Sequence, residues 1–413
     1  MKHRASHTAS PPGNAERRPH LGVDDILRAH GEAFRRNRAL APVQLGVMRA
    51  IVACRTAELG GHLDVCLDCG HKRPSYNSCG NRHCPKCQSL AQDEWIESRK
   101  PRILPVHYFH GVFTLPHQLN ALALRNAELV YDLLFASASD ALLAVAADPA
   151  HLGALPAVTM VLHTWTRDLR YHIHLHAIVS GGGLSPDGDR WIATARTYLL
   201  PNDVLSPVLR GKFLDGLRKA WDQGRLNFGG GCADLARPRA FKRFLSKLYE
   251  IHWLVYDKPS FGGAEQVVEY LGRYTHRTGI SNQRLLSMDE EGVRFRTRDD
   301  QVATLAPHEF LRRFLLHVLP KGLKKIRHYG LLAPGNVRTR LPAARLALGV
   351  LVPPPEPRRI DWCERLLRLT GVDPTLCPAC GARLVRRPFR GVGICAVEAG
   401  DVAPVLPRRE DSS

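Results

Sequence analysis

Histidines alternate with apolar residues over residues 171–180, and three glycines follow directly. A period of two is typical of a strand with one polar face and one buried face. Side chains two residues apart on a strand lie roughly 6.6 Å apart on the same side. His172, His174 and His176 therefore form a row whose adjacent members can converge on one cation.

A strand whose histidines simply face solvent is the alternative interpretation. Three histidines in strict alternation, followed by the three glycines 181–183, favour a metal site over that alternative. We expect the glycines to end the strand and to let a large group approach its backbone.

The rest of the chain changes repeatedly between the period of a strand and the period of a helix. Strands are expected over residues 106–115, 158–165, 190–199 and 251–256, with a hairpin over 280–298. Helices are expected over residues 23–59 (in two or three pieces), 88–99, 117–147, 203–222, 238–250, 265–276 and 308–319. Because the strands come in antiparallel-looking pairs interrupted by helices, the sequence predicts an α+β fold rather than a doubly wound sheet.

The net charge of the chain indicates the kind of partner that it binds. The 413 residues include 58 Lys and Arg against 39 Asp and Glu, which gives a formal net charge of +19. Such an excess indicates a polyanionic partner, most often nucleic acid, although a generally basic proteome would also produce it.

The N-terminal residues, the apolar stretches and the cysteines of the sequence predict the cellular compartment. Residues 1–20 are polar and basic, which is untypical of a signal peptide and is expected of a disordered tail. The apolar stretch 133–147 is short and contains Asp140, so it predicts a core helix and no membrane span. Eleven cysteines without an export signal favour metal thiolates over disulfides, and we expect a reducing, cytoplasmic compartment.

Two Cys-x-x-Cys knuckles lie fourteen residues apart. This spacing predicts a tetrahedral Zn²⁺ site made of Cys66, Cys69, Cys84 and Cys87. Buried free cysteines are the alternative, and the spacing argues against them. A structural zinc contributes on the order of 10–16 kcal/mol to the folding of a small module.

Other cysteines leave alternatives open. Cys79 and His83, together with His62, either build a second zinc site or surround the first one. Cys377 and Cys380 form a further knuckle without a second one nearby, so we assign it no metal.

Tyr270 and Tyr274 lie four residues apart in a predicted helix, so they share a face at a separation of roughly 6 Å. Arg273 and Arg277 have the same spacing on the neighbouring stripe. Aromatic residues at this spacing are more often core packing than catalysis. The arginines and the polar string around Asn282 favour a functional face, because a packing face rarely carries so many donors.

The histidine row and the tyrosine pair together suggest one chemistry. A cation held by imidazoles would grip the oxygens of a DNA phosphodiester, and a tyrosyl oxygen would attack the phosphorus to leave a 5′-phosphotyrosine and a free 3′-OH. Because tyrosine has a pKa of about 10, the cation and the arginines must stabilise the phenolate. Rejoining then needs no ATP, and the chain contains no Gly-x-x-x-x-Gly-Lys-Ser/Thr sequence.

Several stretches resemble the HUH-type, two-tyrosine transposases of the insertion sequence 91 family, and they occur in the order found in that family. The matching stretches are residues 76–79, 82–88, 113–116, 162–165, 172–183, 270–277, 280–282, 312–322 and 327–330. Together they span about residues 23–345. One departure lies before the histidine strand, where the family usually has Gly-Gln and this chain has Thr166-Arg167.

The resemblance implies an N-terminal helical zinc-binding module, then an HUH-endonuclease antiparallel sheet with flanking helices, then a basic C-terminal segment. It implies His174 and His176 as the metal pair and Tyr270 and Tyr274 as nucleophiles, and His172 is our candidate for the third ligand. The implied cofactors are structural Zn²⁺ and catalytic Mg²⁺ or Mn²⁺. The implied partner is single-stranded DNA at the ends of the element, reached by a rolling-circle route.

Domain boundaries and DNA-contacting residues complete the prediction. The expected divisions are a disordered tail (1–20), a zinc-binding domain (21–100), an HUH nuclease domain (101–300), a basic helical DNA-binding extension (301–350), and a Pro-rich linker with a C-terminal tail (351–413). The expected DNA-binding residues are Arg273, Arg277, Asn282, Lys321, Lys324, Lys325 and Arg327.

Two other functions are compatible with the same sequence. A replication initiator or conjugative relaxase would use the same chemistry for another biological task. A catalytically inactive, zinc-containing DNA-binding regulator would bind DNA in a salt-sensitive way without cleaving it. The oligomeric state stays open.

Overall fold

The computed structural model describes residues 21–261, 266–267, 272, 278–351 and 360–389. Contacts within the chain divide it into two compact units. The large unit comprises Met1–Val52 and Gly80–Asp361, and the small unit comprises Ala53–Cys79 and Trp362–Ser413.

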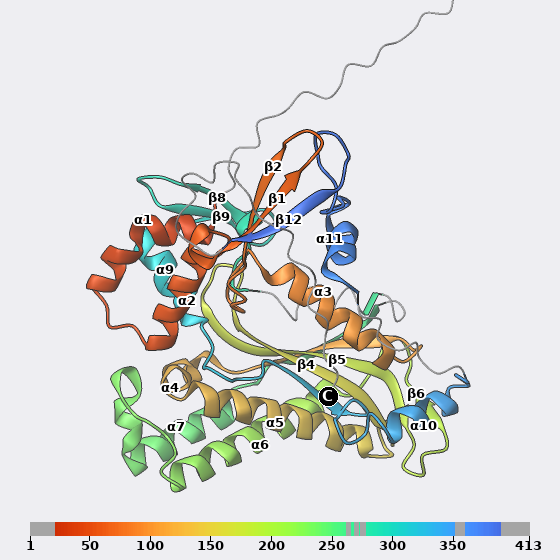
Figure 1. Cartoon of the computed structure of the whole chain (residues 1–413). Coiled ribbons are helices and arrows are strands. Elements are labelled where there is room, and N and C mark those ends of the chain that lie inside the picture. Colours follow the sequence, from red (N-terminus) through yellow and green to blue (C-terminus); the bar gives the residue numbers. More distant parts are fainter. Residues whose placement is uncertain (1–20, 262–265, 268–271, 273–277, 352–359, 390–413) are drawn as a thin grey trace, which may run out of the picture. The chain divides into compact units, whose positions relative to one another are not determined.

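A six-stranded antiparallel sheet forms the centre of the large unit (Figure 1). Its strand order is β11–β4–β5–β3–β7, with β6 paired to β5. The strands are β3 (Tyr108–Thr114), β4 (Leu155–Trp165), β5 (Tyr171–Leu184), β6 (Trp191–Ala193), β7 (Val255–Phe261) and β11 (Ile326–Gly330). On β5, His174 lies opposite His163 of β4 on one side and Thr114 of β3 on the other. The predicted α+β class with an antiparallel sheet is confirmed.

The two faces of this sheet have different neighbours. Ile173, Leu175, Ala177 and Val179 of β5 are buried in the main core, against the helices that Figure 1 shows together on one side of the sheet. These helices are α4 (Asn120–Arg125), α5 (Ala127–Ala147), α6 (Asn202–Asp222) and α7 (Pro238–Glu250). The histidines of β5 point to the other face, where α3 (Gln88–Arg99) lies.

Helix α5 is long and apolar enough to cross a membrane, judged by length and composition only. Val130, Leu134 and Phe135 of this helix are fully buried in the main core. A mostly buried helix passes the same test as a membrane span, so its apolar character is accounted for by packing, as the sequence predicts for a core helix.

The glycines that follow the histidines do not end the strand, which corrects the expectation from sequence. Strand β5 continues to Leu184. A Cβ atom on Gly181 would lie 2.2 Å from Nε2 of His107, and one on Gly183 would lie 2.7 Å from the carbonyl carbon of Leu155. The glycines are therefore needed because neighbouring segments of the same fold approach the backbone closely.

Two other predicted strands have different bounds. The expected strand over 190–199 is only three residues long (β6), and the strand expected over 251–256 begins at Val255. Residues before Val255 are held in the core instead, because the backbone carbonyl of Trp253 accepts a hydrogen bond from Ser206 Oγ (2.6 Å) and its ring packs against Phe213. The predicted hairpin is present as β8 and β9, joined through residues 289–292.

The remaining elements of the large unit pack beside the sheet. Helix α1 contacts α9, where the rings of Phe34 and His308 lie 5.7 Å apart, and Phe310 of α9 contacts Phe295 of β9. These elements are α1 (Val23–Arg36), α2 (Pro42–Ala53), β8 (Leu285–Met288), β9 (Val293–Arg296), β10 (Val302–Leu305), α9 (Pro307–Leu316) and α10 (Arg340–Ala347). Short 3-10 helices cover Lys100–Arg102, His117–Leu119, Gly230–Ala236 and Asn282–Arg284.

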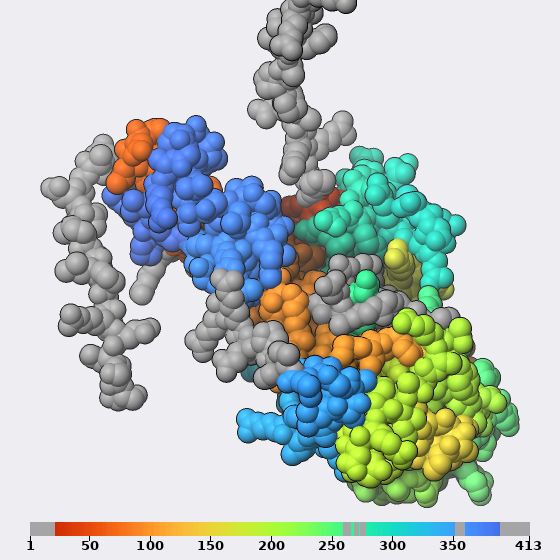
Figure 2. Space-filling view, turned by 90° about the vertical axis from the view of Figure 1, so that its right-hand side faces the viewer, coloured from red at the N-terminus to blue at the C-terminus, as the bar shows by residue number. Residues whose placement is uncertain are grey.

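The small unit is built from two segments that are far apart in sequence. Its sheet has the order β12–β1–β2, and its elements are β1 (Gly61–Cys66), β2 (Lys72–Tyr76), α11 (Trp362–Thr370), β12 (Leu384–Phe389) and a 3-10 helix at Ala57–Leu59. Asp64, which is 2 % exposed, accepts hydrogen bonds from Arg73 (3.0 Å) and Arg386 (2.8 Å). Figure 2 shows the two segments of this unit, orange and blue, in one body. The residues after 360 thus supply a strand and a helix to a folded unit.

Burial makes one histidine of the large unit a source of acid sensitivity. His317 is 3 % exposed, and its ring contacts Thr164 Oγ1 (3.3 Å) and the carbonyl oxygen of Leu169 (3.1 Å). Burial lowers the pKa of His317 to about 4. The unfolded chain takes up this proton near pH 6.5, so the stability contributed by the neutral ring is complete above that pH and is lost as the pH falls toward 4.

We therefore expect the free energy of unfolding to fall between pH 6.5 and pH 4, with a contribution from His317 on the order of 3 kcal/mol. The His317→Gln variant should be less stable at pH 7 but should lose less stability over this range. Urea denaturation at a series of pH values measures both. The exposed His151 gives the matched control, because His151→Gln should keep the wild-type slope. A wild-type slope in His317→Gln would show that another group is responsible.

Candidate metal centre and nucleic-acid interface

Three histidines meet on the face of the large sheet opposite the main core. His163 of β4 and His174 and His176 of β5 each offer a ring nitrogen, and these atoms all lie within 4.8 Å of one another. The Nε2 atoms of His174 and His176 are 3.1 Å apart. Two metal–nitrogen bonds of about 2.1 Å at tetrahedral or octahedral angles place their nitrogens roughly 3.0–3.4 Å apart, so the pair fits one divalent cation.

The other ring nitrogens of this pair are already engaged. Nδ1 of His174 lies 3.1 Å from the carbonyl oxygen of His172, so it donates its proton there. Nδ1 of His176 lies 2.7 Å from Nε2 of His110 on β3. A bond at Nδ1 fixes the ring and leaves Nε2 as the metal-binding atom. His110 therefore holds the ring of His176, and the sequence analysis did not single it out.

These rings are kept neutral by burial. His174 is 9 % exposed and His110 is 4 % exposed. Burial, and next to it the positive charge of His172, lowers the pKa of His174 to about 4. Burial and then Lys258 lower the pKa of His110 to about 4. A neutral imidazole is the form that binds a metal, so the site is ready for a cation at neutral pH.

The third member of the group differs from the one expected. His172 is absent from the metal-holding groups among the described residues, and His163 takes its place. His172 lies near the start of β5, two residues before His174, whereas His163 lies directly across the sheet from His174. Counting outward from the connection does not find this pair, because the register shifts by one residue between the pairs Trp165–Tyr171 and His163–His174.

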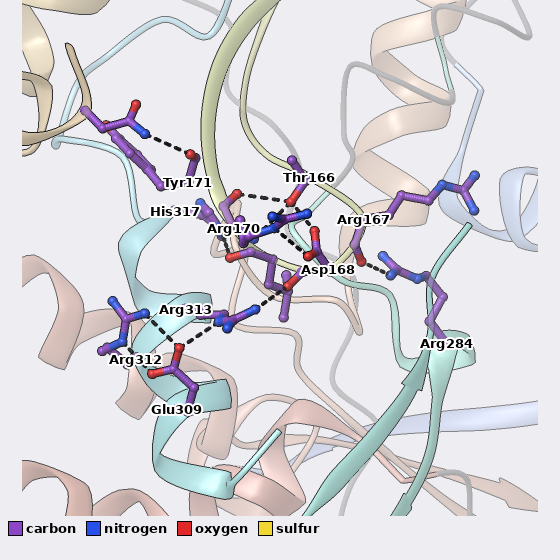
Figure 3. A network of polar contacts seen from close by, with 12 residues as sticks. Thr166, Arg167, Asp168, Arg170, Tyr171, Arg284, Glu309, Arg312, Arg313 and His317 are labelled. Carbon is purple, nitrogen blue, oxygen red and sulfur yellow. Dashed lines mark hydrogen bonds and ion pairs between the residues drawn. The ribbon is translucent and has the colours of Figure 1, made fainter. Parts of the chain in front are cut away.

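The connection between β4 and β5 is held by its own side chains and by arginines from two other elements (Figure 3). Thr166 Oγ1 accepts a hydrogen bond from the backbone N–H of Arg170 (3.0 Å) and donates to Asp168 Oδ1 (2.5 Å). Arg313 donates to the carbonyl oxygen of Asp168 (3.1 Å), and Arg284 donates to that of Arg167. Leu169 has a φ of 62° and is fully buried, so the turn is constrained at its tip.

These contacts concern the position where the sequence departs from the family pattern, at Thr166 and Arg167. Both residues make hydrogen bonds: Thr166 within the connection and Arg167 through its guanidinium to the carbonyl oxygen of Thr297 (3.2 Å). The connection is therefore ordered with the residues that this chain has.

A pocket lies on the histidine-bearing face of the sheet. Ile178 of β5 and Thr159 of β4 are paired across the sheet and line it, and Ile178 is two residues beyond His176. The other lining residues are Trp95, Arg99, Arg102, Ile103, Tyr108, Val267, His328 and Leu332. Because side chains two residues apart on a strand are about 7 Å apart, Ile178 places the pocket about 7 Å along β5 from His176.

The pocket has flat rings and a cationic group at its wall. The rings of Trp95 and His328 are stacked with an interplanar angle of 12°, and the guanidinium of Arg99 lies 5.7 Å from the Trp95 ring centre. Nε of Arg99 is buried and has no hydrogen-bond partner among the described residues. Burial lowers the pKa of Arg99. An unsatisfied donor beside stacked rings is suited to a planar, hydrogen-bonding ligand.

The two tyrosines and two of the arginines expected to act on DNA lie outside the described residues. These are Tyr270, Tyr274, Arg273 and Arg277. Asn282 is described, and its Oδ1 accepts a hydrogen bond from the backbone N–H of Val23 at the start of α1 (3.2 Å). Asn282 thus has a structural contact, and its predicted role at DNA stays a prediction.

The basic residues after α9 fall into two groups. Lys321 and Lys324 are exposed. Arg327 forms an ion pair with Asp132 of α5, and its guanidinium lies 4.2 Å from the Phe135 ring centre. Burial, and next to it Arg82, lowers the pKa of Lys325 to about 8. Lys321 and Lys324 are therefore the members of this set that keep their charge at the surface.

The cysteines of the small unit form a group that differs from the predicted one. Cys66 and Cys69 lie with Cys377 and Cys380, and the four Sγ atoms are within 4.8 Å of one another. The expected tetrahedral site of Cys66 and Cys69 with Cys84 and Cys87 stays a prediction, because these two knuckles belong to different units. The C-terminal knuckle, to which the sequence analysis gave no metal, lies beside the first knuckle in the small unit.

The remaining candidate zinc ligands lie in pairs within each unit. Sγ atoms of Cys84 and Cys87 in the large unit are within 4.8 Å of each other, and so are those of Cys54 and Cys79 in the small unit. His83 belongs to no metal-holding group among the described residues, and its Nε2 accepts a hydrogen bond from the backbone N–H of Leu319 (3.3 Å). Burial lowers the pKa of His83 to about 3.

Comparison with known proteins identifies relatives for both halves of the chain. A family model described as "Transposase zinc-binding domain" matches residues 26–115, and one described as "Putative transposase" matches residues 157–340. The "Putative transposase y4qJ" of Sinorhizobium fredii is 46% identical over 381 residues, which cover 90% of this chain and 96% of that protein. The "Transposase for insertion sequence element IS801" of Pseudomonas savastanoi pv. phaseolicola is 28% identical over 367 residues, 84% of each chain. No solved structure matches the chain.

The composition of the histidine group is directly testable by metal binding. His163→Ala removes one of three convergent nitrogens and should weaken Mn²⁺ binding more than about tenfold, and His110→Ala should do so by about 10–100-fold through the loss of ring orientation. His172→Ala should bind Mn²⁺ like the wild type. Titration of the full chain with Mn²⁺, followed by electron paramagnetic resonance, measures the free ion. Unchanged binding in His163→Ala, or a large loss in His172→Ala, would restore the assignment made from sequence.

Proposed function

The chain belongs to the insertion sequence 91 family of transposases, and from this premise we propose that it nicks and transfers single-stranded DNA at the ends of its element. The family makes DNA the partner. The observation that carries the finer proposal is the group of His163, His174 and His176 on the face of the sheet opposite the main core. The Nε2 atoms of His174 and His176 are spaced for one cation. No further observation favours either alternative function, that of a replication initiator or relaxase or that of a DNA-binding regulator.

The proposed site divides its work among named side chains. His163, His174 and His176 would hold Mg²⁺ or Mn²⁺, with His110 fixing the ring of His176. When bound, such a cation supplies Lewis-acid polarisation of the phosphodiester. His172 is half-buried with its ring 5.1 Å from that of His174, so its place is at the edge of this site.

Tyr270 and Tyr274 are the proposed nucleophiles. The Oη atom of one tyrosine loses its proton and forms a bond to phosphorus, and the bond from phosphorus to the 3′ oxygen breaks. That oxygen takes up a proton to become a free 3′-OH, so the number of protons is unchanged. The 5′ end stays on the tyrosine, so the energy of the phosphodiester is retained and the strand can be rejoined to a new 3′-OH. Arg273 and Arg277 are proposed to stabilise the phenolate. The support for these four residues is their spacing in the sequence.

Recognition of an unpaired strand is supported by the pocket beside the histidine group. A base needs a flat surface to stack on and a donor for its edge, and Trp95, His328 and Arg99 offer both. Lys321 and Lys324 are exposed and are proposed to contact the phosphate backbone. The formal net charge of +19 supports salt-dependent binding to DNA.

Zinc and location complete the proposal. The family makes the N-terminal region a zinc-binding domain, and Cys79, Cys84 and Cys87 are proposed zinc ligands, as predicted. His83 is retained as a neighbour of these cysteines in sequence and not as a ligand, because its Nε2 is hydrogen-bonded. We propose that the protein works in the bacterial cytoplasm at the nucleoid.

Covalent capture of DNA tests the reaction. Incubation of the full chain with single-stranded DNA carrying an end of the element and Mg²⁺ or Mn²⁺ should give a protein–DNA adduct that migrates more slowly in a denaturing gel. The Tyr270→Phe/Tyr274→Phe double variant should give none, because no phenol remains to attack. The exposed Tyr198 provides the control, and Tyr198→Phe should behave like the wild type.

The outcomes separate the competing functions. Salt-sensitive DNA binding without any adduct, under either metal, would identify a DNA-binding regulator. An undiminished adduct in the double tyrosine variant would place the nucleophile elsewhere. Adduct formation on replication-origin or transfer-origin DNA but never on element ends would identify an initiator or relaxase.

The proposed base-stacking role of Trp95 predicts a measurable loss of affinity. Because stacking contributes about 1–3 kcal/mol per base, Trp95→Ala should weaken binding to a short single strand by about fivefold or more. Fluorescence anisotropy with a labelled oligonucleotide measures this. Tyr249 is a matched control, since it is an exposed aromatic residue of α7 with Arg210 5.9 Å from its ring centre. Equal losses in Trp95→Ala and Tyr249→Ala would contradict a specific pocket.

A further inference from the structure

We propose that Cys66, Cys69, Cys377 and Cys380 bind one structural zinc ion, so that a C-terminal knuckle completes a zinc ribbon begun in the N-terminal region. The two matching family models end at residues 115 and 340, so Cys377 and Cys380 lie beyond both. The proposal does not depend on the nicking reaction.

The spacing of the four sulfur atoms fits a tetrahedral ion. Sγ of Cys66 lies 3.5 Å from Sγ of Cys380, and Sγ of Cys69 lies 3.6 Å from Sγ of Cys377. Four zinc–sulfur bonds of about 2.3 Å place the sulfurs roughly 3.8 Å apart in a tetrahedron. A disulfide would need a separation of about 2.05 Å, which neither pair has.

Both knuckles are built by the same turn, which is independent support for a shared ligand. The backbone N–H of Gly70 donates to the carbonyl oxygen of Cys66 (3.1 Å), and that of Gly381 donates to Cys377 (2.9 Å). The next residue closes each turn, since Cys66 N–H donates to His71 (2.9 Å) and Cys377 N–H donates to Ala382 (2.8 Å).

The two glycines show why the sequence Cys-x-x-Cys-Gly occurs twice. Gly70 has a φ of 71° and Gly381 a φ of 78°, and no heavy atom would lie within 4 Å of an added Cβ on either. The requirement is therefore conformational and not steric, because positive φ is accessible to glycine without strain. Two turns of one shape, each presenting two thiols to the same point, are the arrangement of a zinc ribbon.

The small unit needs such an ion because its own side chains offer little core. Among its described residues, the buried side chains are Ala53, Cys54, Asp64, Cys66 and Cys377, and none is a large aliphatic or aromatic residue. Strand β12 is largely exposed, yet it pairs with β1 along six residues, beginning at Cys66 opposite Leu384. Small folds of this kind are usually held by a metal or by disulfides.

Zinc content of the full chain tests the proposal. Mass-spectrometric metal analysis should find one zinc fewer per chain in Cys377→Ser/Cys380→Ser than in the wild type. Cys66→Ser/Cys69→Ser should lose the same single ion, and combining all four substitutions should remove no more. Cys363 of α11 is half-buried in the same unit, and Cys363→Ser should keep the wild-type zinc content. Wild-type zinc content in Cys377→Ser/Cys380→Ser, with a loss in Cys66→Ser/Cys69→Ser, would overturn the proposal.

Two further measurements keep the test decisive if a serine variant does not fold. Cys380→His keeps a zinc-binding atom, so it should retain the ion that Cys380→Ser loses, and equal zinc content in the two would contradict ligation. In the wild type, alkylation followed by peptide mass spectrometry should show Cys69 and Cys380 protected, although both are exposed, until a chelator removes zinc. Both should then react together. Full reactivity of Cys380 in the zinc-loaded protein would sink the proposal.

Discussion

The register between β4 and β5 is the constraint on which the histidine group depends. His163 and His174 face one another only because the two strands pair with His163 opposite His174 and Val161 opposite His176. A shift of one residue would turn every histidine toward the helices and expose the apolar residues between them. The apolar side of β5, buried against α5 and its neighbours, therefore fixes the positions of the histidines as firmly as it fixes the core.

The net charge counts every arginine, but many arginines of this molecule hold its own backbone and are not available to a polyanionic partner. Several guanidinium groups donate to backbone carbonyl oxygens of connecting segments: Arg82 to Leu323 and Pro320, Arg284 to Arg167, Arg313 to Asp168, and Arg345 to Pro101. Carbonyl oxygens of irregular segments lack strand or helix partners, and a guanidinium offers five donors to satisfy them. Part of the basic excess thus holds the fold together, and the exposed lysines are better candidates for meeting a polyanion.

The sequence was informative where a pattern is local and uninformative where partners are distant. The strand around His174 followed from a period of two over ten residues, because alternation directly reports burial of one side. The α+β class followed from pairs of predicted strands interrupted by helices. His163 was missed because the register shifts by one residue between Trp165 and His163, so counting outward from the connection would place Ile173 opposite it. The start of β7 was missed because the carbonyl oxygen of Trp253 takes its hydrogen bond from the side chain of Ser206, which spacing does not reveal.

The glycines and the cysteines show two different limits. Gly181 and Gly183 were expected to end a strand, but they report the close approach of His107 and Leu155, which are remote in sequence. The spacing of Cys66 and Cys69 is that of a zinc knuckle whichever second knuckle completes it, so local sequence could not choose between the candidates. Tyr270 and Tyr274 lie outside the described residues, and their role rests on sequence alone.

The pairing of β1 with β12 has a consequence for how the protein is made. Strand β1 ends at Cys66 and its partner begins at Leu384, so the ribosome must synthesise the whole intervening chain before the two can meet. Until then β1 presents an open edge, which is the kind of surface that pairs with other chains. Contacts of such sequence separation form late and slowly. A message truncated near its 3′ end would therefore yield a chain that contains every strand of the large sheet but lacks β12. One edge of β1 would then stay unpaired.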